Sequence, residues 1–154
     1  MPLQFIALET EQVKRLRAGA ADANAQPPEV SISDGDGNPC RHCLTEIARD
    51  KPMFILAHRP FNSLQPYAET GPIFLCAEDC ARYPQAAGVP ALYQKREMLM
   101  RGYDHHERII YGTGKVIDMA AIHTEASHLF ADPRLAFIHL RSPTNNCYHF
   151  RIER

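Results

Sequence analysis

Residues 135–153 read LAFIHLR-SPTNN-CYHFRIE and contain the clearest β-hairpin signal in the chain. Apolar and polar residues alternate on both sides of the loop over 142–146, and successive side chains of a strand point to opposite faces. We therefore expect strands over 135–141 and 147–153. Their register should place apolar side chains opposite apolar side chains, because a slip by one residue would turn every side chain to the other face.

The predicted register gives the hairpin one apolar face and one polar face. It pairs Arg141 with Cys147, His139 with His149 and Phe137 with Arg151. A thiol beside imidazole and guanidinium groups has the surroundings that lower a cysteine pKa, so Cys147 as nucleophile and His139 as base form a candidate catalytic pair. The arginines could instead bind a carboxylate or phosphate, and the polar face could equally be the solvated side of an edge hairpin.

The rest of the chain predicts further strands and two or three helices. Strand patterns occupy 4–8, 30–33, 53–58, 73–76, 96–103 and 108–117, the last two forming a hairpin. A helix capped by Thr10 would bury Val13 and Leu16, and a second helix would run over 119–130. Because strands and helices do not alternate strictly, we expect an α+β domain around a largely antiparallel sheet.

Length and composition indicate one globular domain over residues 1–154. The chain is 45% hydrophobic and 23% charged, near globular averages, and its 154 residues suit a single core. A formal net charge of -1 argues against a strongly basic nucleic-acid binder. The sequence shows no signal-peptide pattern and no run of ~20 apolar residues, which predicts a cytoplasmic protein without a membrane segment. A protein partner or a small anionic ligand fits this composition.

Four of the five cysteines form two closely spaced pairs. Cys40 and Cys43 make a C-x2-C pattern after a turn, and Cys76 and Cys80 make a C-x3-C pattern at the end of a strand. Two thiolates on one small loop can bind the same ion at about 2.3 Å, and four make a closed tetrahedral zinc site that is structural rather than catalytic. We expect a zinc knuckle formed by 38–44 and 75–81.

Two other interpretations of these cysteines stay open. They could be buried free thiols, since cysteine is among the most buried residue types. Cys40 and Cys43 could also form a redox dithiol. His42 lies inside the first pair and could replace a cysteine as a ligand, and the stretch between the two pairs is longer than the ~15–20 residues of common zinc ribbons.

Short segments spread over nearly the whole chain carry a family resemblance. They are NPCR at 38–41, QPY at 65–67, GPIF at 71–74, RGYD at 101–104, ADPRLAFIH at 131–139 and CY at 147–148. In this order they resemble the bacterial family catalogued as domain of unknown function 1203. The resemblance implies a single-domain bacterial protein and no particular activity. It highlights Cys40, Arg41, His139 and Cys147. Of these, Cys40, His139 and Cys147 could converge on one site.

The sequence supports two hypotheses from different classes. The first is an uncharacterised small cytosolic protein with a structural zinc site built by the two cysteine pairs, acting as a binding or accessory module. The second is a thiol-dependent enzyme or redox protein that uses Cys147 and His139, or the Cys40–Cys43 dithiol. Zinc is the one cofactor predicted, and the patterns do not decide whether the protein is an enzyme.

Overall fold

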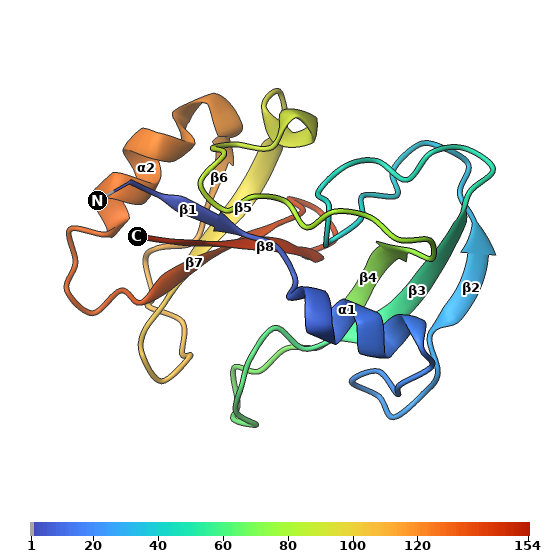
Figure 1. Cartoon of the computed structure of the whole chain (residues 1–154). Helices are drawn as coiled ribbons and strands as arrows, with labels where there is room; N and C mark the ends of the chain where they lie inside the picture. Colours follow the sequence, from blue (N-terminus) through green and yellow to red (C-terminus); the bar gives the residue numbers. More distant parts are fainter. Residues whose placement is uncertain (1) are drawn as a thin grey trace.

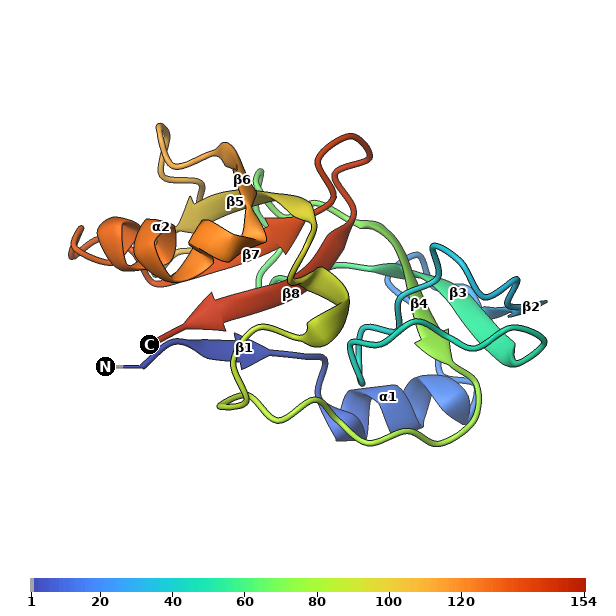
Figure 2. The same ribbon diagram turned by 90° about the horizontal axis from the view of Figure 1, so that it is seen from above.

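The computed structural model describes residues 2–154, which form two antiparallel sheets that lie side by side (Figures 1 and 2). The larger sheet has five strands in the order β1-β8-β7-β5-β6, and the smaller has three in the order β2-β3-β4. The strands are β1 (Gln4–Ile6), β2 (Glu29–Ile32), β3 (Pro52–His58), β4 (Gly71–Cys76), β5 (Glu97–Tyr103), β6 (Lys115–Asp118), β7 (Phe137–Arg141) and β8 (Tyr148–Glu153). The helices are α1 (Thr10–Arg17) and α2 (Ile122–Leu129), with 3-10 turns η1 (Ala91–Tyr93) and η2 (Met119–Ala121). The predicted α+β class, with largely antiparallel sheets and a C-terminal hairpin, is confirmed.

Helix α2 covers one face of the larger sheet. Ile122, Ala126 and Phe130 are spaced four residues apart, so they share one side of the helix. All three are buried in a core that includes Ile138 and Leu140 of β7. The first and last strands meet in this sheet, because β1 pairs with β8 and Gln4 lies opposite Glu153 (Figure 2).

Helix α1 covers the smaller sheet (Figure 1). Val13 and Leu16 are its buried residues, as the sequence predicted. They join a second core with Leu56, Ile73 and Leu75 of β3 and β4. The helix therefore adds a layer to a sheet that would otherwise expose its apolar side chains.

Helix α1 begins differently from the predicted helix, whereas the second helical segment begins at Met119 as predicted. Glu9 is the N-cap of α1 and makes no side-chain cap bond, and the hydroxyl of Thr10 lies 3.0 Å from Nε2 of His42 instead. The helix predicted over 119–130 opens with the 3-10 turn η2, whose first backbone groups are capped by the carboxylate of Asp118. Thr10 thus serves a tertiary contact, which a local capping pattern cannot show.

Residues 104–114 form a loop, so the second strand predicted over 108–117 is wrong except for its last residues. The side chain of Thr113 satisfies backbone groups there: its hydroxyl accepts from the N–H of Gly102 at 2.9 Å and donates to the carbonyl of Ile110 at 2.6 Å. Gly102 permits the close approach of Thr113, because a Cβ at that position would lie 3.1 Å from Oγ1 of Thr113 and 2.5 Å from Cδ1 of Leu135. The strand that pairs with this edge of β5 is the short β6.

The C-terminal hairpin forms, but its register differs from the predicted one. His139 lies opposite Arg151 rather than His149. A β-bulge then makes Tyr148 the partner of Arg141. A bulge inserts one residue into one strand and turns the side chains beyond it to the other face. Tyr148 therefore shares the face of His139, and His149 does not, which corrects both predicted positions.

The polar face of the hairpin is buried, so its interpretation as a solvated edge is wrong. His139 is 0% exposed and Arg141 is 3% exposed. The imidazole of His139 packs against Tyr148 and Phe61, with ring centroids 4.8 Å and 5.1 Å away. His139 and Arg141 lie where the larger sheet meets the smaller sheet and its connecting loops. The smaller sheet and these loops cover the polar face of the hairpin and exclude water from it.

Burial keeps three imidazoles neutral in the folded protein. It lowers the pKa of His58 to about 4 and the pKa of His149 to about 2, and it holds the pKa of His139 well below its ordinary value. The positive charge of Arg141 adds to the effect at all three residues. Desolvation and a nearby cation both disfavour the protonated ring.

We expect the free energy of unfolding to decrease as the pH falls below about 6.5. The unfolded chain then takes up protons at these imidazoles and the folded chain does not, so each contributes up to about 1.4 kcal/mol per pH unit until its folded pKa is reached. Urea unfolding followed by circular dichroism from about pH 7.5 to about pH 5 measures this slope. His149→Gln should reduce this slope by the contribution of about one proton, which is roughly 1.4 kcal/mol per pH unit.

His105→Gln is the matched control, because it removes an exposed imidazole. Metal release at low pH would affect the wild type and both variants alike, so the difference between variants isolates His149. Identical slopes for the wild type and His149→Gln would contradict the neutral, buried state of this ring.

Candidate metal centre

Four cysteine sulfurs converge beside the end of β4. Cys40 and Cys43 lie on the loop between β2 and β3, Cys76 is the last residue of β4, and Cys80 follows in the next loop. Their four Sγ atoms all lie within 4.8 Å of one another. Cys40 is fully buried, and the other three are partly buried. The structure therefore brings together the four residues that the spacing singled out.

A tight turn presents the first cysteine pair. The N–H of Leu44 donates to the carbonyl of Cys40 at 2.9 Å, and the N–H of Cys40 donates to the carbonyl of Thr45 at 2.9 Å. Leu44 adopts a φ of 56°, in the left-handed region, where the turn closes. The N–H of Arg41 donates to the carbonyl of Phe74 at 3.0 Å, so the turn is fixed against β4.

Backbone N–H groups point at the buried sulfur of Cys40. The N–H of Cys76 lies 3.3 Å from this sulfur, and the N–H of His42 lies 3.4 Å from it. Hydrogen bonds of this kind favour the charged thiolate over the thiol. The loop that supplies two ligands thus also supplies donors that stabilise a metal-bound sulfur.

Helix α1 contributes a second set of contacts, which the sequence analysis missed. Arg17 donates from Nη2 to the sulfur of Cys80 at 3.1 Å and from Nε to the carbonyl of Cys76 at 3.0 Å. Nδ1 of His42 lies 3.2 Å from the same Cys80 sulfur, and its Nε2 contacts Thr10. His42 therefore lies next to the cluster as a partner of a ligand rather than as a fifth member.

The four thiols influence one another's ionisation. Hydrogen bonding, first from Cys40, lowers the pKa of Cys43 well below its ordinary value. The pKa values of Cys76 and Cys80 are raised, first through their hydrogen bonds with Cys40. Thiolates this close repel one another, so some of them keep their protons unless a cation is bound. A divalent metal ion is the group that would allow all four to ionise together.

The donor set fits a tetrahedral ion. Four sulfurs at about 2.3 Å from a zinc ion would be about 3.8 Å from one another. The sulfurs of Cys40 and Cys80 are 4.0 Å apart, so small side-chain movements would complete the tetrahedron. All four positions are protein sulfurs, which leaves no place for a substrate or a reactive water.

The second predicted pair, Cys147 and His139, is not joined by a hydrogen bond in the described part of the chain. Nδ1 of His139 accepts from Nη2 of Arg141 at 3.2 Å. The thiol of Cys147 lies 3.8 Å from the carbonyl of Asn145. Cys40 belongs to the four-cysteine cluster, which includes neither His139 nor Cys147.

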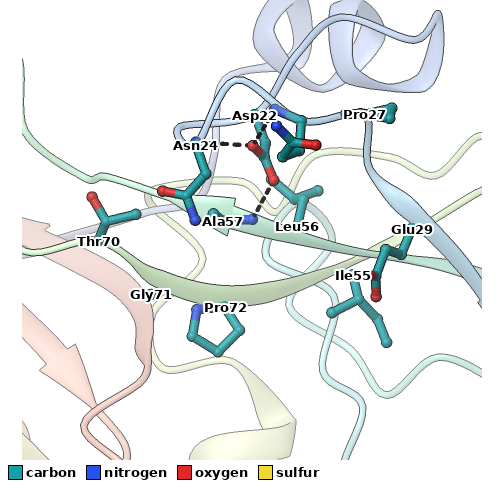
Figure 3. A pocket seen from close by; sticks show the side chains of 11 residues that line it. Asp22, Asn24, Pro27, Glu29, Ile55, Leu56, Ala57, Thr70, Gly71 and Pro72 are labelled. Atoms are coloured by element: carbon teal, nitrogen blue, oxygen red, sulfur yellow. Dashed lines mark hydrogen bonds between the residues drawn. The ribbon is translucent and has the colours of Figure 1, made fainter.

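A groove of about 630 Å³ runs beside the smaller sheet (Figure 3). Asp22 is its most conspicuous polar residue. The carboxylate accepts from the backbone N–H groups of Asn24, Gln26 and Ala57 at 2.9, 3.1 and 2.9 Å (Figure 3). These bonds fix the loop after α1 against β3, so the carboxylate of Asp22 serves the structure of the loop.

The fold and the cluster define an α+β protein of two antiparallel sheets with a four-cysteine group that could hold a metal ion. The family model described as protein of unknown function (DUF1203) matches residues 37–154, more than half of the chain, so the chain belongs to this family. Comparisons with curated proteins and with solved structures gave no significant match. Within residues 2–154, no helix is long and apolar enough to cross a membrane.

Arg17→Gln should weaken zinc binding about tenfold or more, because partners of metal ligands commonly contribute this much to affinity. Competition with a chromogenic chelator measures the change. Lys14→Gln is the matched control, since Lys14 lies on the same helix with its side chain 64% exposed. Equal zinc affinity in Arg17→Gln and the wild type would show that the guanidinium does not support the site.

Proposed function

We propose that this chain is a small zinc protein whose four-cysteine site is structural, and that it acts as a binding or accessory module. The observation that carries the proposal is the convergence of four sulfurs within 4.8 Å of one another. A bound zinc ion would join the loop over 38–44 to the segment over 75–81. Helix α1 contacts both, through Thr10 and His42 on the first segment and through Arg17 on the second.

The surroundings of the cluster support a structural role. Arg17 and His42 donate to or contact the sulfur of Cys80, and two backbone N–H groups face the sulfur of Cys40. Catalytic zinc sites keep one position for water or substrate, and a set of four thiolates has none.

We further propose that residues 1–154 form one domain of a cytoplasmic protein. The first strand, β1, pairs with the last strand, β8, so the beginning of the chain is part of the same sheet as its end. A reducing compartment would keep the five cysteines available as thiols, which suits metal binding better than disulfide formation.

The thiol-dependent alternative makes a different prediction about reactivity. The Cys40–Cys43 dithiol would have to work inside a group of four interacting sulfurs, and Cys147 would have to work without a hydrogen bond to His139. A catalytic thiol reacts early with an alkylating reagent, and a thiol bound to zinc is protected until the metal is removed.

Elemental analysis of protein purified without a histidine tag, combined with thiol counting, tests the proposal directly. We expect about one zinc ion per chain and four thiols that become reactive together after chelation. Cys147→Ser should keep the zinc and lose the early-reacting thiol. No metal, or a stoichiometric metal other than zinc, would overturn the proposed zinc site.

Loss of one ligand should release the metal and lower the melting temperature. Zinc present at a thousand times its dissociation constant stabilises the folded state by about 4 kcal/mol, which corresponds to roughly 8–16 °C for a chain of this size. Cys43→Ser should show this decrease in differential scanning fluorimetry, and Cys147→Ser should melt close to the wild type. Equal melting temperatures for Cys43→Ser and the wild type would argue against a structural metal.

A further inference from the structure

A small cavity of about 190 Å³ lies where the end of β3, the start of β4 and the loop of the C-terminal hairpin meet. Its walls include His58, Glu69, Arg141, Asn146 and Cys147. None of these residues belongs to the four-cysteine cluster. The cavity therefore needs an account separate from the metal site.

Arg141 brings an incompletely paired charge to this cavity. It is 3% exposed, and its Nε has no hydrogen-bond partner. Nη1 donates to the carbonyl of Asn146 at 3.1 Å and Nη2 to His139 at 3.2 Å, and both acceptors are uncharged. A buried guanidinium is stable when a carboxylate or another anion completes its hydrogen bonds.

One carboxylate reaches Arg141, and it is shared. Glu69 lies 3.6 Å from Arg141 and only 2.6 Å from Arg101. It also accepts a hydrogen bond from Nδ2 of Asn146 at 3.0 Å. The single negative charge of Glu69 is therefore divided between two guanidiniums, and the closer one is Arg101.

A second buried guanidinium increases the positive charge near the cavity. Arg41 is 2% exposed and donates to the carbonyls of Tyr148 and Pro39 at 2.6 Å and 2.7 Å. Within residues 2–154 no carboxylate lies within ion-pair distance of it. Burial, and then the charges of Arg41 and Arg141, lower the pKa of the cavity residue His58. Two buried guanidiniums therefore lie at or near the cavity, against the single carboxylate of Glu69.

We propose that this cavity binds the carboxylate or phosphate group of a small molecule, with Arg141 as the principal contact and Asn146 and His58 beside it. Charge-assisted hydrogen bonds from a guanidinium to an oxyanion are short and strong, and the low local dielectric strengthens them further. This proposal gives the binding role proposed above a site and a ligand class. It does not require zinc, so either proposal can fail without the other.

The size of the cavity limits what it can hold. Pockets for drug-sized ligands are typically about 300–1,000 Å³, so 190 Å³ suits an anionic head group or a very small acid. Thr70, Gly71 and Pro72 line both this cavity and the 630 Å³ groove of Figure 3. A larger ligand could place its anionic end against Arg141 and the rest of its body along the groove.

Cys147 provides a reporter inside the cavity. Its thiolate can attack the methylene carbon of iodoacetate or iodoacetamide, which forms a C–S bond and releases iodide. The two reagents differ mainly in charge, so the ratio of their rate constants measures attraction of a carboxylate to the site. The test uses the full, zinc-loaded chain, and peptide mapping by mass spectrometry assigns the alkylation to Cys147.

We expect the iodoacetate-to-iodoacetamide rate ratio at Cys147 to exceed that of a peptide covering residues 142–152 by about tenfold. Inorganic phosphate and acetate should each slow the iodoacetate reaction in the wild type. Stronger protection by phosphate would assign the site to phosphate-bearing ligands, and stronger protection by acetate would assign it to carboxylates. A ratio equal to that of the peptide, with protection by neither anion, would overturn the proposal.

Two variants sharpen the test. Arg141→Met should abolish the preference for iodoacetate, although loss of its bond to Asn146 could also disturb the hairpin loop. Glu69→Gln removes the competing carboxylate and should lower the phosphate concentration that protects Cys147 severalfold. Glu125→Gln on α2 is the matched control. It also removes the carboxylate of an ion pair, that with Lys115, but neither residue lines the cavity. No change in Glu69→Gln would contradict the role of Arg141.

Discussion

The buried guanidinium of Arg41 is the interaction on which the arrangement of the two sheets depends. Its hydrogen bonds to Tyr148 and Pro39 connect the larger sheet to the loop that carries the first cysteine pair. Its backbone adds two more connections, since its carbonyl accepts from Leu8 and its N–H donates to Phe74. One residue thus joins β8, β4 and the segment before α1, at a position where unpaired polar groups would be costly.

Both proposed sites lie next to this junction. Cys40 precedes Arg41 in the chain, and the contacts that hold Arg41 against β4 bring Cys40 to within hydrogen-bonding distance of the N–H of Cys76. On the other side, Tyr148 follows Cys147, and both residues line the small cavity. A metal ion at the cysteines would stiffen the same loop that positions Arg41. The cysteine cluster and the small cavity are therefore connected through a short stretch of backbone, although each is built from its own side chains.

Several features followed from local patterns alone. The two cysteine pairs were identified because each pair occupies one short loop, and short loops fix the distance between their own side chains. The α+β class, the buried stripe of α1 and the two strands of the C-terminal hairpin followed from hydrophobic periodicity. The resemblance to the DUF1203 family was also correct, and it rested on short motifs preserved in order along the chain.

The sequence by itself determined most of the elements and the two cysteine pairs, because both depend on neighbours a few residues apart; the strand predicted over 108–117 was the main exception. Only the tertiary structure decided the hairpin register, where a bulge that leaves no sequence signature moved Tyr148 to the face of His139. It alone showed that this face is buried, that Arg17 supports Cys80, and that Glu69 is shared between Arg101 and Arg141. These contacts join residues far apart in the chain, and the packing of one sheet against another sets them, which no local periodicity encodes.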